Sequence, residues 1–250
     1  MNLPNPFPGV AINPQTTIAP ASKKLPKIRR AGTNGAIICM VLDESGSMSS
    51  IRDATIEGFN GFVTQQRQDR QAGEINLTFI KFEGGNIKTV YNNQPIDQVA
   101  VLDRKGYEPA GGTNLLDAIG HGIEQVSQSL KTFAKDQRPA VIFCILTDGA
   151  ENSSQKYNNQ DIRNMVETAE GKEWTFTFLG ANIDAFAVGQ TFGMRMSNTV
   201  SYNVGNMTDV MASVSAGTSR LRYAKSQGLS NDEIYATDLY TAQEREKMSK

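Results

Sequence analysis

The chain has 250 residues, a formal net charge of -1 and 39% hydrophobic residues. This length allows one sizeable domain with extensions, and the composition is typical of a chain with a folded apolar core. A net charge near zero provides no global basic field for recruiting nucleic acid. No apolar run approaches the roughly 20 residues that a membrane-spanning helix needs.

The amino-terminal segment, residues 1–34, differs in composition from the rest of the chain. It holds six of the nine prolines, which restrict φ and remove backbone donors, so we expect an extended arm. Its second half, residues 23–30, is basic. The sequence leaves open whether this arm is a solvated leader or docks on a partner or a neighbouring copy. Because Pro4, Pro6 and Pro8 interrupt any apolar signal-peptide core, we expect a cytoplasmic or virion protein.

The first elements after the arm follow from hydrophobic patterning. Residues 36–42 form a continuous apolar run, which predicts a parallel strand covered on both faces. Apolar residues at helical spacing predict a helix over residues 50–70. Residues 75–82 and 87–91 flank a Gly-rich turn and predict a hairpin at the edge of the sheet. We expect a long loop over residues 92–112.

Beyond this loop, predicted helices and strands alternate. Helices are predicted over residues 114–134, 161–171, 184–192 and 207–227, and strands over residues 140–146, 174–179 and 199–204. The alternation predicts an α/β fold with a doubly wound, mostly parallel sheet, one antiparallel edge strand and helices on both faces. The domain would occupy residues 35–227.

A polar tail follows the domain over residues 228–250. Its composition predicts a solvated segment. The alternative is a tail that packs on the domain through its apolar and aromatic side chains, which are Ile234, Tyr235, Leu239 and Tyr240.

The two cysteines, Cys39 and Cys144, both lie inside apolar strand runs. We therefore expect two buried free thiols rather than a disulfide. The sequence has no cluster of Cys and His, which excludes the usual structural zinc site.

Oxygen-bearing side chains follow the first predicted strand at alternate positions. Asp43, Ser45 and Ser47 are separated by single residues, so their side chains can converge from an extended loop. Gly46 allows a tight turn between the two serines. Oxygen ligands at the carboxyl end of a central strand suit a hard cation such as Mg2+.

Two later segments supply further oxygen atoms. Thr113 follows two glycines at the end of the long loop. Asp148 is the second residue after the strand predicted over residues 140–146, with Thr147 between them. Each residue also has an ordinary explanation. Thr113 could cap the helix that follows it, and Asp148 could be a turn residue.

Taken together, these five residues resemble the metal-ion-dependent adhesion site of von Willebrand factor A domains. The family pattern is Asp-x-Ser-x-Ser, a distant Thr and then a Thr-Asp-Gly-like strand end, and the resemblance covers most of the chain. It implies that Ser45, Ser47 and Thr113 bind the metal directly. It also implies that Asp43 and Asp148 hold the metal mostly through bound waters.

The resemblance implies a function in binding rather than in catalysis. Mg2+ is the expected ion, with Mn2+ and Ca2+ as other candidates, and it would take a carboxylate from a protein partner. Compact size and the lack of an export signal resemble stand-alone A-domain proteins of bacteria and phages. Glu44 adds a negative side chain inside the motif, and strand alternation predicts that it points away from the metal ligands.

Two other functions are compatible with the sequence. One is a structural or assembly protein, for example of a virus particle, that self-assembles through the amino-terminal arm. The other is a Mg2+-dependent hydrolase with Asp43 as nucleophile. Against the hydrolase, no general base pairs with a nucleophile and no lysine lies beside the motif to clamp phosphate. We therefore expect no enzymatic activity, no membrane contact and no specific nucleic-acid binding.

Overall fold

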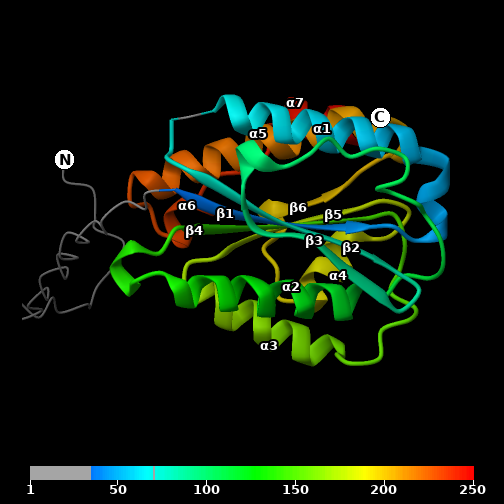
Figure 1. Ribbon diagram of the computed structural model, residues 1–250, viewed down its shortest axis with the longest axis horizontal. Helices are drawn as coiled ribbons and strands as arrows, with labels where there is room; N and C mark the ends of the chain where they lie inside the picture. The colour runs from blue at the N-terminus through cyan, green and yellow to red at the C-terminus, as the bar shows by residue number, and fades with distance from the viewer. Residues whose placement is uncertain (1–34, 70) are drawn as a thin grey trace, which may run out of the picture.

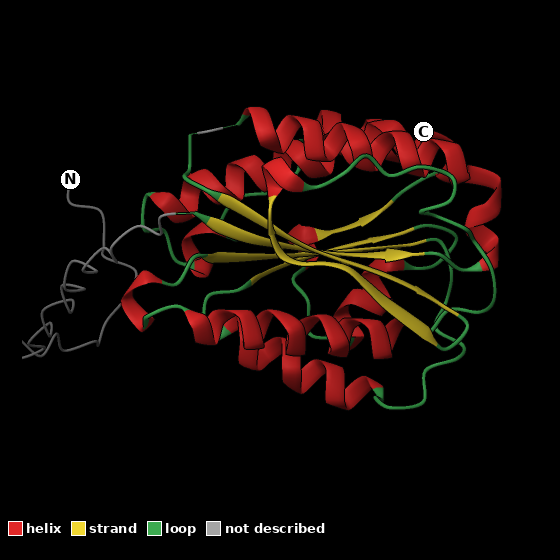
Figure 2. Cartoon of the chain, in the orientation of Figure 1, coloured by secondary structure: helices red, strands yellow, loops and turns green. Residues whose placement is uncertain are grey.

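A six-stranded sheet with the order β3-β2-β1-β4-β5-β6 forms the centre of the domain (Figures 1 and 2). This computed structural model describes residues 35–69 and 71–250, so the predicted arm lies outside the described residues. The strands are β1 (Ala36–Asp43), β2 (Ile75–Glu83), β3 (Asn86–Pro95), β4 (Ala140–Thr147), β5 (Thr175–Gly180) and β6 (Thr199–Ser201). All neighbours pair in parallel except β2 and β3. The predicted fold class is therefore confirmed.

Helices cover both faces of the sheet (Figure 1). One face carries α1 (Arg52–Gln68), α5 (Met207–Ser226) and α7 (Ala242–Ser249), and the other carries α2 (Leu115–Ser129), α3 (Asn159–Glu170) and α4 (Ala185–Thr191). A short helix, α6 (Asn231–Ile234), lies between α5 and α7 in the chain. In the described part of the chain, no helix combines the length and apolarity needed to cross a membrane.

The central strands are apolar because both of their faces are covered. Every residue of β1 and of β4 is buried. Successive residues of β1 alternate between two cores, so Ile38 and Met40 contact the α1 and α5 side while Ile37 and Cys39 contact the α2 and α3 side. Cys144 faces the core opposite to Cys39, and both thiols are free and buried, as predicted.

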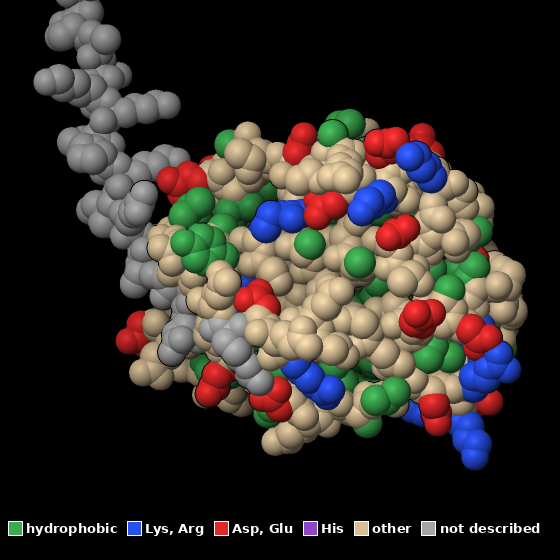
Figure 3. Space-filling view, turned by 90° about the horizontal axis from the view of Figure 1, so that it is seen from above, with side chains coloured by type: hydrophobic (Ala, Val, Ile, Leu, Met, Phe, Trp, Pro, Cys, Tyr) green, Lys and Arg blue, Asp and Glu red, His purple; other side chains and the backbone are tan. Residues whose placement is uncertain are grey.

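The outer surface carries charges of both signs. Over the face formed by α1, α5 and α7, acidic and basic side chains are interspersed and no large patch of one sign is visible (Figure 3). This distribution agrees with the net charge of -1 and offers no broad basic surface for nucleic acid on that face.

The edge hairpin is longer than predicted. Asn92 and Asn93 continue β3 as far as Pro95 instead of starting a loop, and a 3-10 turn, Ile96–Gln98, follows. Asn93 has a φ of 52°, and its N–H donates a 3.1 Å hydrogen bond to the Thr78 hydroxyl. The strand is half-exposed and polar at this irregularity, so its sequence lacks the apolar alternation that marks a strand.

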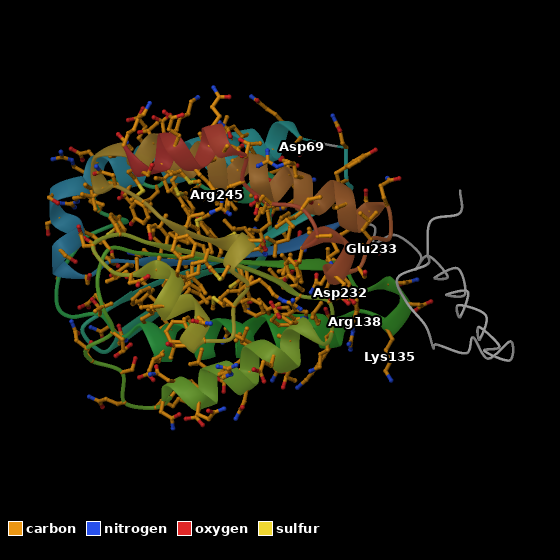
Figure 4. All side chains as sticks on the ribbon, turned by 180° about the vertical axis from the view of Figure 1, so that it is seen from behind. Asp69, Lys135, Arg138, Asp232, Glu233 and Arg245 are labelled. Carbon is orange, nitrogen blue, oxygen red and sulfur yellow. The ribbon has the colours of Figure 1, made fainter. Side chains whose placement is uncertain are left out.

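The polar tail packs on the domain, so the prediction of a solvated tail was wrong. Tyr240 and Met248 are 1% and 0% exposed. Gly217 on α5 admits the Tyr240 ring, since a Cβ atom there would lie 3.1 Å from it. Arg245 points from α7 to the sheet edge (Figure 4) and donates a 2.7 Å hydrogen bond to the Ser197 carbonyl. A few isolated large side chains suffice to bury a segment whose average composition is polar.

Candidate metal centre

The first predicted ligand, Asp43, is the last residue of β1 at the carboxyl end of the sheet, on the right in Figure 1. Its side chain is fully buried. One carboxylate oxygen accepts the Ser45 N–H at 2.7 Å, and the other accepts the Thr147 hydroxyl of β4 at 2.5 Å. Asp43 is therefore fixed between two adjacent central strands, and its carboxylate orients the loop that follows.

The two serines of the motif connect this loop to the end of β4 through their hydroxyl groups. The hydroxyl oxygens of Ser45 and Ser47 lie 3.1 Å apart, and the Ser47 hydroxyl donates a 2.6 Å hydrogen bond to an Asp148 carboxylate oxygen. Ser45 is buried. The loop turns at Gly46 into a 3-10 helix, Gly46–Ile51, which directs the chain into α1.

Thr113, in the loop before α2, lies close to Ser47 and to the end of β4. The Gly46 N–H donates to the Gly111 carbonyl at 3.1 Å, which ties this loop to the serine loop. A Cβ atom on Gly149 would lie 3.1 Å from the Thr113 hydroxyl oxygen and 3.7 Å from that of Ser47. All five predicted residues are thus brought together from three segments of the chain.

Thr113 does not cap α2. The N-cap of α2 is Asn114, and no side chain caps it there. In the first turn, the Glu151 carboxylate accepts the Leu116 N–H at 2.9 Å, and the Ser154 hydroxyl accepts the Asp117 N–H at 3.1 Å. Glu151 is a residue whose supporting role sequence reasoning missed, because its partner lies 35 positions away.

Burial makes it costly to keep both carboxyl groups of the cluster, Asp43 and Asp148, ionised. Burial raises the pKa of Asp43 to about 6, against hydrogen bonds from Thr147 and Ser45 that lower it, and the Asp148 charge raises it further. Burial also raises the pKa of Asp148, while the Ser47 hydroxyl lowers it. A cation between the two carboxylates would relieve the cost of keeping both ionised.

The donor set consists of oxygen atoms only. It contains three hydroxyls and two carboxylates, and within residues 35–69 and 71–250 no group of three or more His, Cys, Asp or Glu side chains could hold a metal. Mg2+ prefers oxygen ligands, is bound through one or two carboxylates and keeps several waters. The residues present therefore fit a small hard cation and do not fit a thiolate or imidazole site.

Glu44 points away from the cluster, as the alternation predicts. Its carboxylate lies 2.6 Å from the ammonium group of Lys81 on β2, and both residues are buried. The expectation that no lysine lies beside the motif was therefore wrong. Lys81 does so, and a lysine inside the apolar β2 run is an unusual residue that signals a buried partner.

Other polar residues near this end of the sheet have structural partners. Asp184 caps α4 by accepting the Ala187 N–H at 3.0 Å. The Asn182 amide lies 3.4 Å from the Asp148 carbonyl. His121, on α2, is hydrogen-bonded to Thr89 at 2.8 Å.

Solved structures of other proteins resemble this fold. No protein-family model matches the chain, and no curated protein matches it in sequence. The vWF domain of the type V pili tip protein Mfa5 from Porphyromonas gingivalis aligns at a TM-score of 0.56 and 10% identity, over 74% of this chain and 95% of that chain. Proximal thread matrix protein 1 from the mussel byssus, in a structure with a zinc-occupied MIDAS motif, aligns at 0.54 and 14% identity.

The third structure is the pilus adhesin SpaC from Lactobacillus rhamnosus GG in its open conformation, at a TM-score of 0.56 and 12% identity. The aligned regions cover 75% of this chain in both cases, but only 48% of the mussel protein and 30% of SpaC. At such low identity the likeness concerns the fold. The described part of the chain therefore has the fold of a von Willebrand factor A domain.

Proposed function

We propose that this domain binds a divalent cation, Mg2+ in the first place, and uses it to capture a carboxylate on a protein partner. Ser45, Ser47 and Thr113 would bind the ion directly, and Asp43 and Asp148 would hold it mostly through water. The bound ion would supply a positive centre that an anionic ligand can complete. The observation that carries the proposal is the convergence of these five side chains at the carboxyl end of the sheet.

The solved relatives support an interaction module. One is a pilus adhesin, one a pilus tip protein and one a byssus matrix protein whose MIDAS motif is occupied by zinc in one structure. Their named roles lie in adhesion and matrices, which favours binding over catalysis here. Zinc in a relative supports a divalent ion in general, and the preference for Mg2+ rests on the hydroxyl-rich donor set. Location in the cytoplasm or in a virion stays a prediction from the sequence.

The surroundings of Asp43 argue against the hydrolase alternative. A nucleophilic carboxylate needs an accessible oxygen atom, whereas Asp43 is fully buried and both of its oxygens accept hydrogen bonds, from Ser45 and Thr147. Such a carboxylate is suited to orienting other ligands. The assembly alternative depends on the arm, which lies outside the described residues.

Calorimetric titration of Mg2+ into the full chain tests the proposal. Wild type should bind the ion, and Asp148→Ala should lose binding by tenfold or more because a carboxylate of the cluster is missing. Asp184→Ala is the matched control, since this nearby carboxylate caps α4 and should leave Mg2+ affinity unchanged. Equal affinity in wild type and Asp148→Ala would refute the site. Partner capture should then require both Mg2+ and Asp148.

A further inference from the structure

A buried ion pair lies beside the proposed metal site. Lys81 and Glu44 are 2.6 Å apart, and their side chains are only 6% and 9% exposed. Glu44 also accepts the Glu108 N–H at 2.5 Å, and Lys81 donates to the Gly106 carbonyl at 2.6 Å. A buried charge is costly unless it is paired and hydrogen-bonded, and here both charges are.

The charge of Glu44 is close enough to act on the site. Glu44 follows Asp43 directly in the chain. The Tyr107 hydroxyl donates a 2.5 Å hydrogen bond to the Asp43 carbonyl, and Lys81 lies 5.9 Å from the Tyr107 ring centroid. The Asp43 carboxylate in turn accepts the hydroxyl of Thr147, the residue before Asp148. The three carboxylates therefore share one electrostatic neighbourhood.

A charge count gives Lys81 a defined effect. A divalent cation would balance the charges of Asp43 and Asp148, which leaves the charge of Glu44, the residue after Asp43, in excess. Lys81 cancels that charge. Without Lys81 the metal-loaded site would carry one net negative charge and would repel the carboxylate that the proposed function requires.

We propose that Lys81 determines ligand specificity by neutralising Glu44, which allows the metal-loaded site to accept an anionic partner group. This inference rests on the proposed function. Lys81 acts through charge on a ligand that it does not touch. It should therefore change the binding of metal and of carboxylate in opposite directions, whereas a residue that merely holds the loop would weaken both.

The test compares wild type with Lys81→Met, Glu44→Gln and the double variant. Each protein is titrated with Mn2+ and then with 13C-acetate, whose NMR relaxation increases when acetate binds next to the paramagnetic ion. Acetate affinity should follow the net charge of the loaded site. Glu44→Gln should bind acetate most tightly, wild type and the double variant should bind it equally, and Lys81→Met should bind it most weakly.

Loss of Lys81 should weaken acetate binding roughly tenfold, which is the order of magnitude expected for the loss of one unit charge near the ligand at an effective dielectric constant near 20. Mn2+ affinity should change the other way, being highest in Lys81→Met and lowest in Glu44→Gln. Rescue of acetate binding in the double variant separates neutralisation from loop support, because that variant lacks the ion pair altogether.

Lys225→Met is the matched control. It breaks another ion pair, 3.0 Å between Lys225 and Glu173, just before the amino end of β5. That end of the sheet lies opposite the site, so both affinities should equal those of wild type. If Lys81→Met fails to fold, Glu44→Gln alone must still raise acetate affinity and lower Mn2+ affinity.

Each outcome is decisive. A wild type that binds no Mn2+ would overturn the proposed function itself. A wild type that binds Mn2+ and acetate, with the same acetate affinity in all the variants that fold, would overturn the role of Lys81 and leave the metal site standing. Parallel loss of both affinities in Lys81→Met without rescue by Glu44→Gln would reduce the pair to structural support.

Discussion

The Ser47 hydroxyl donates a 2.6 Å hydrogen bond to the carboxylate of Asp148, a residue 101 positions further along the chain. The bond joins the loop after β1 to the end of β4, two strands that pair in parallel at the centre of the sheet. Thr113 comes from a third segment, so the cluster forms only when β1 and β4 are in register and the loop before α2 is in place. Tests of the site must therefore separate loss of ligands from loss of fold.

The Thr113 hydroxyl provides such a test. Thr113→Val keeps the shape of the side chain and removes the oxygen atom, so Mg2+ affinity should fall about tenfold or more while the melting temperature changes little. Thr113→Ser retains the hydroxyl and should retain most of the affinity. Calorimetry and thermal unfolding on both variants check this. Full Mg2+ binding by Thr113→Val would show that the hydroxyl is not a ligand.

Mg2+ affinity should depend on pH through Asp43. The pKa of its buried carboxyl is about 6, and Mg2+ binds the deprotonated form, so protons compete with the metal below that pH. The apparent affinity should be constant above about pH 7 and fall about tenfold for each pH unit below pH 6. Titrations at half-unit intervals from pH 5 to 8 measure this. An affinity that is flat across the range would contradict the role of Asp43.

In the metal-free protein, the raised pKa of Asp43 should make folding stability depend on pH. The pKa of Asp43 rises from 3.8 to about 6 on folding, so between these values the folded state binds more protons than the unfolded state. The contribution of Asp43 to stability therefore decreases as pH rises through this window. Asp43→Asn, which stays neutral, should gain stability relative to wild type between pH 4 and 7, by up to about 3 kcal/mol.

Urea unfolding in chelator at pH 4.5 and 7.5 measures this difference between the two proteins. The comparison cancels the titration of the other carboxyl groups, which both proteins share. If the difference in unfolding free energy between Asp43→Asn and wild type does not increase with pH, the Asp43 charge does not destabilise the metal-free protein.

The tail after α5 should contribute to folding stability. Tyr240 is 1% exposed and packs against Gly217, so Tyr240→Ala should cost about 3–5 kcal/mol, as other buried aromatic truncations do. Tyr223→Ala is the control, because Tyr223 on α5 is 53% exposed and its loss should cost much less. Denaturant unfolding of both variants checks this, and equal small losses would mean that the tail is dispensable.

The sequence predicted the sheet and the convergence of the five oxygen-bearing side chains because both leave local signals. Continuous apolar runs mark β1 and β4, and the spacing of Asp43, Ser45 and Ser47 marks the loop between β1 and α1. These features depend on residues that are neighbours in the chain. Thr113 and Asp148 could be placed because each lies at the end of a predicted element.

The rest depends on contacts between distant residues. Lys81 pairs with Glu44 across 37 positions, and Tyr107 reaches the Asp43 carbonyl across 64. Neither contact has a periodic or spacing signal, and strand pairing must be known before they can be inferred. The buried tail is similar, because Tyr240 and Met248 are single large side chains in a polar segment.

The anchoring of Asp43 between β1 and β4 also bears on the entropy of ligand capture. Both strands are fully buried, and each carboxylate oxygen already has a hydrogen-bond partner. The conformational freedom of this support is lost during folding, before any ion arrives. A cation bound as proposed would meet a preorganised cradle, so its binding free energy would not be consumed in ordering the backbone.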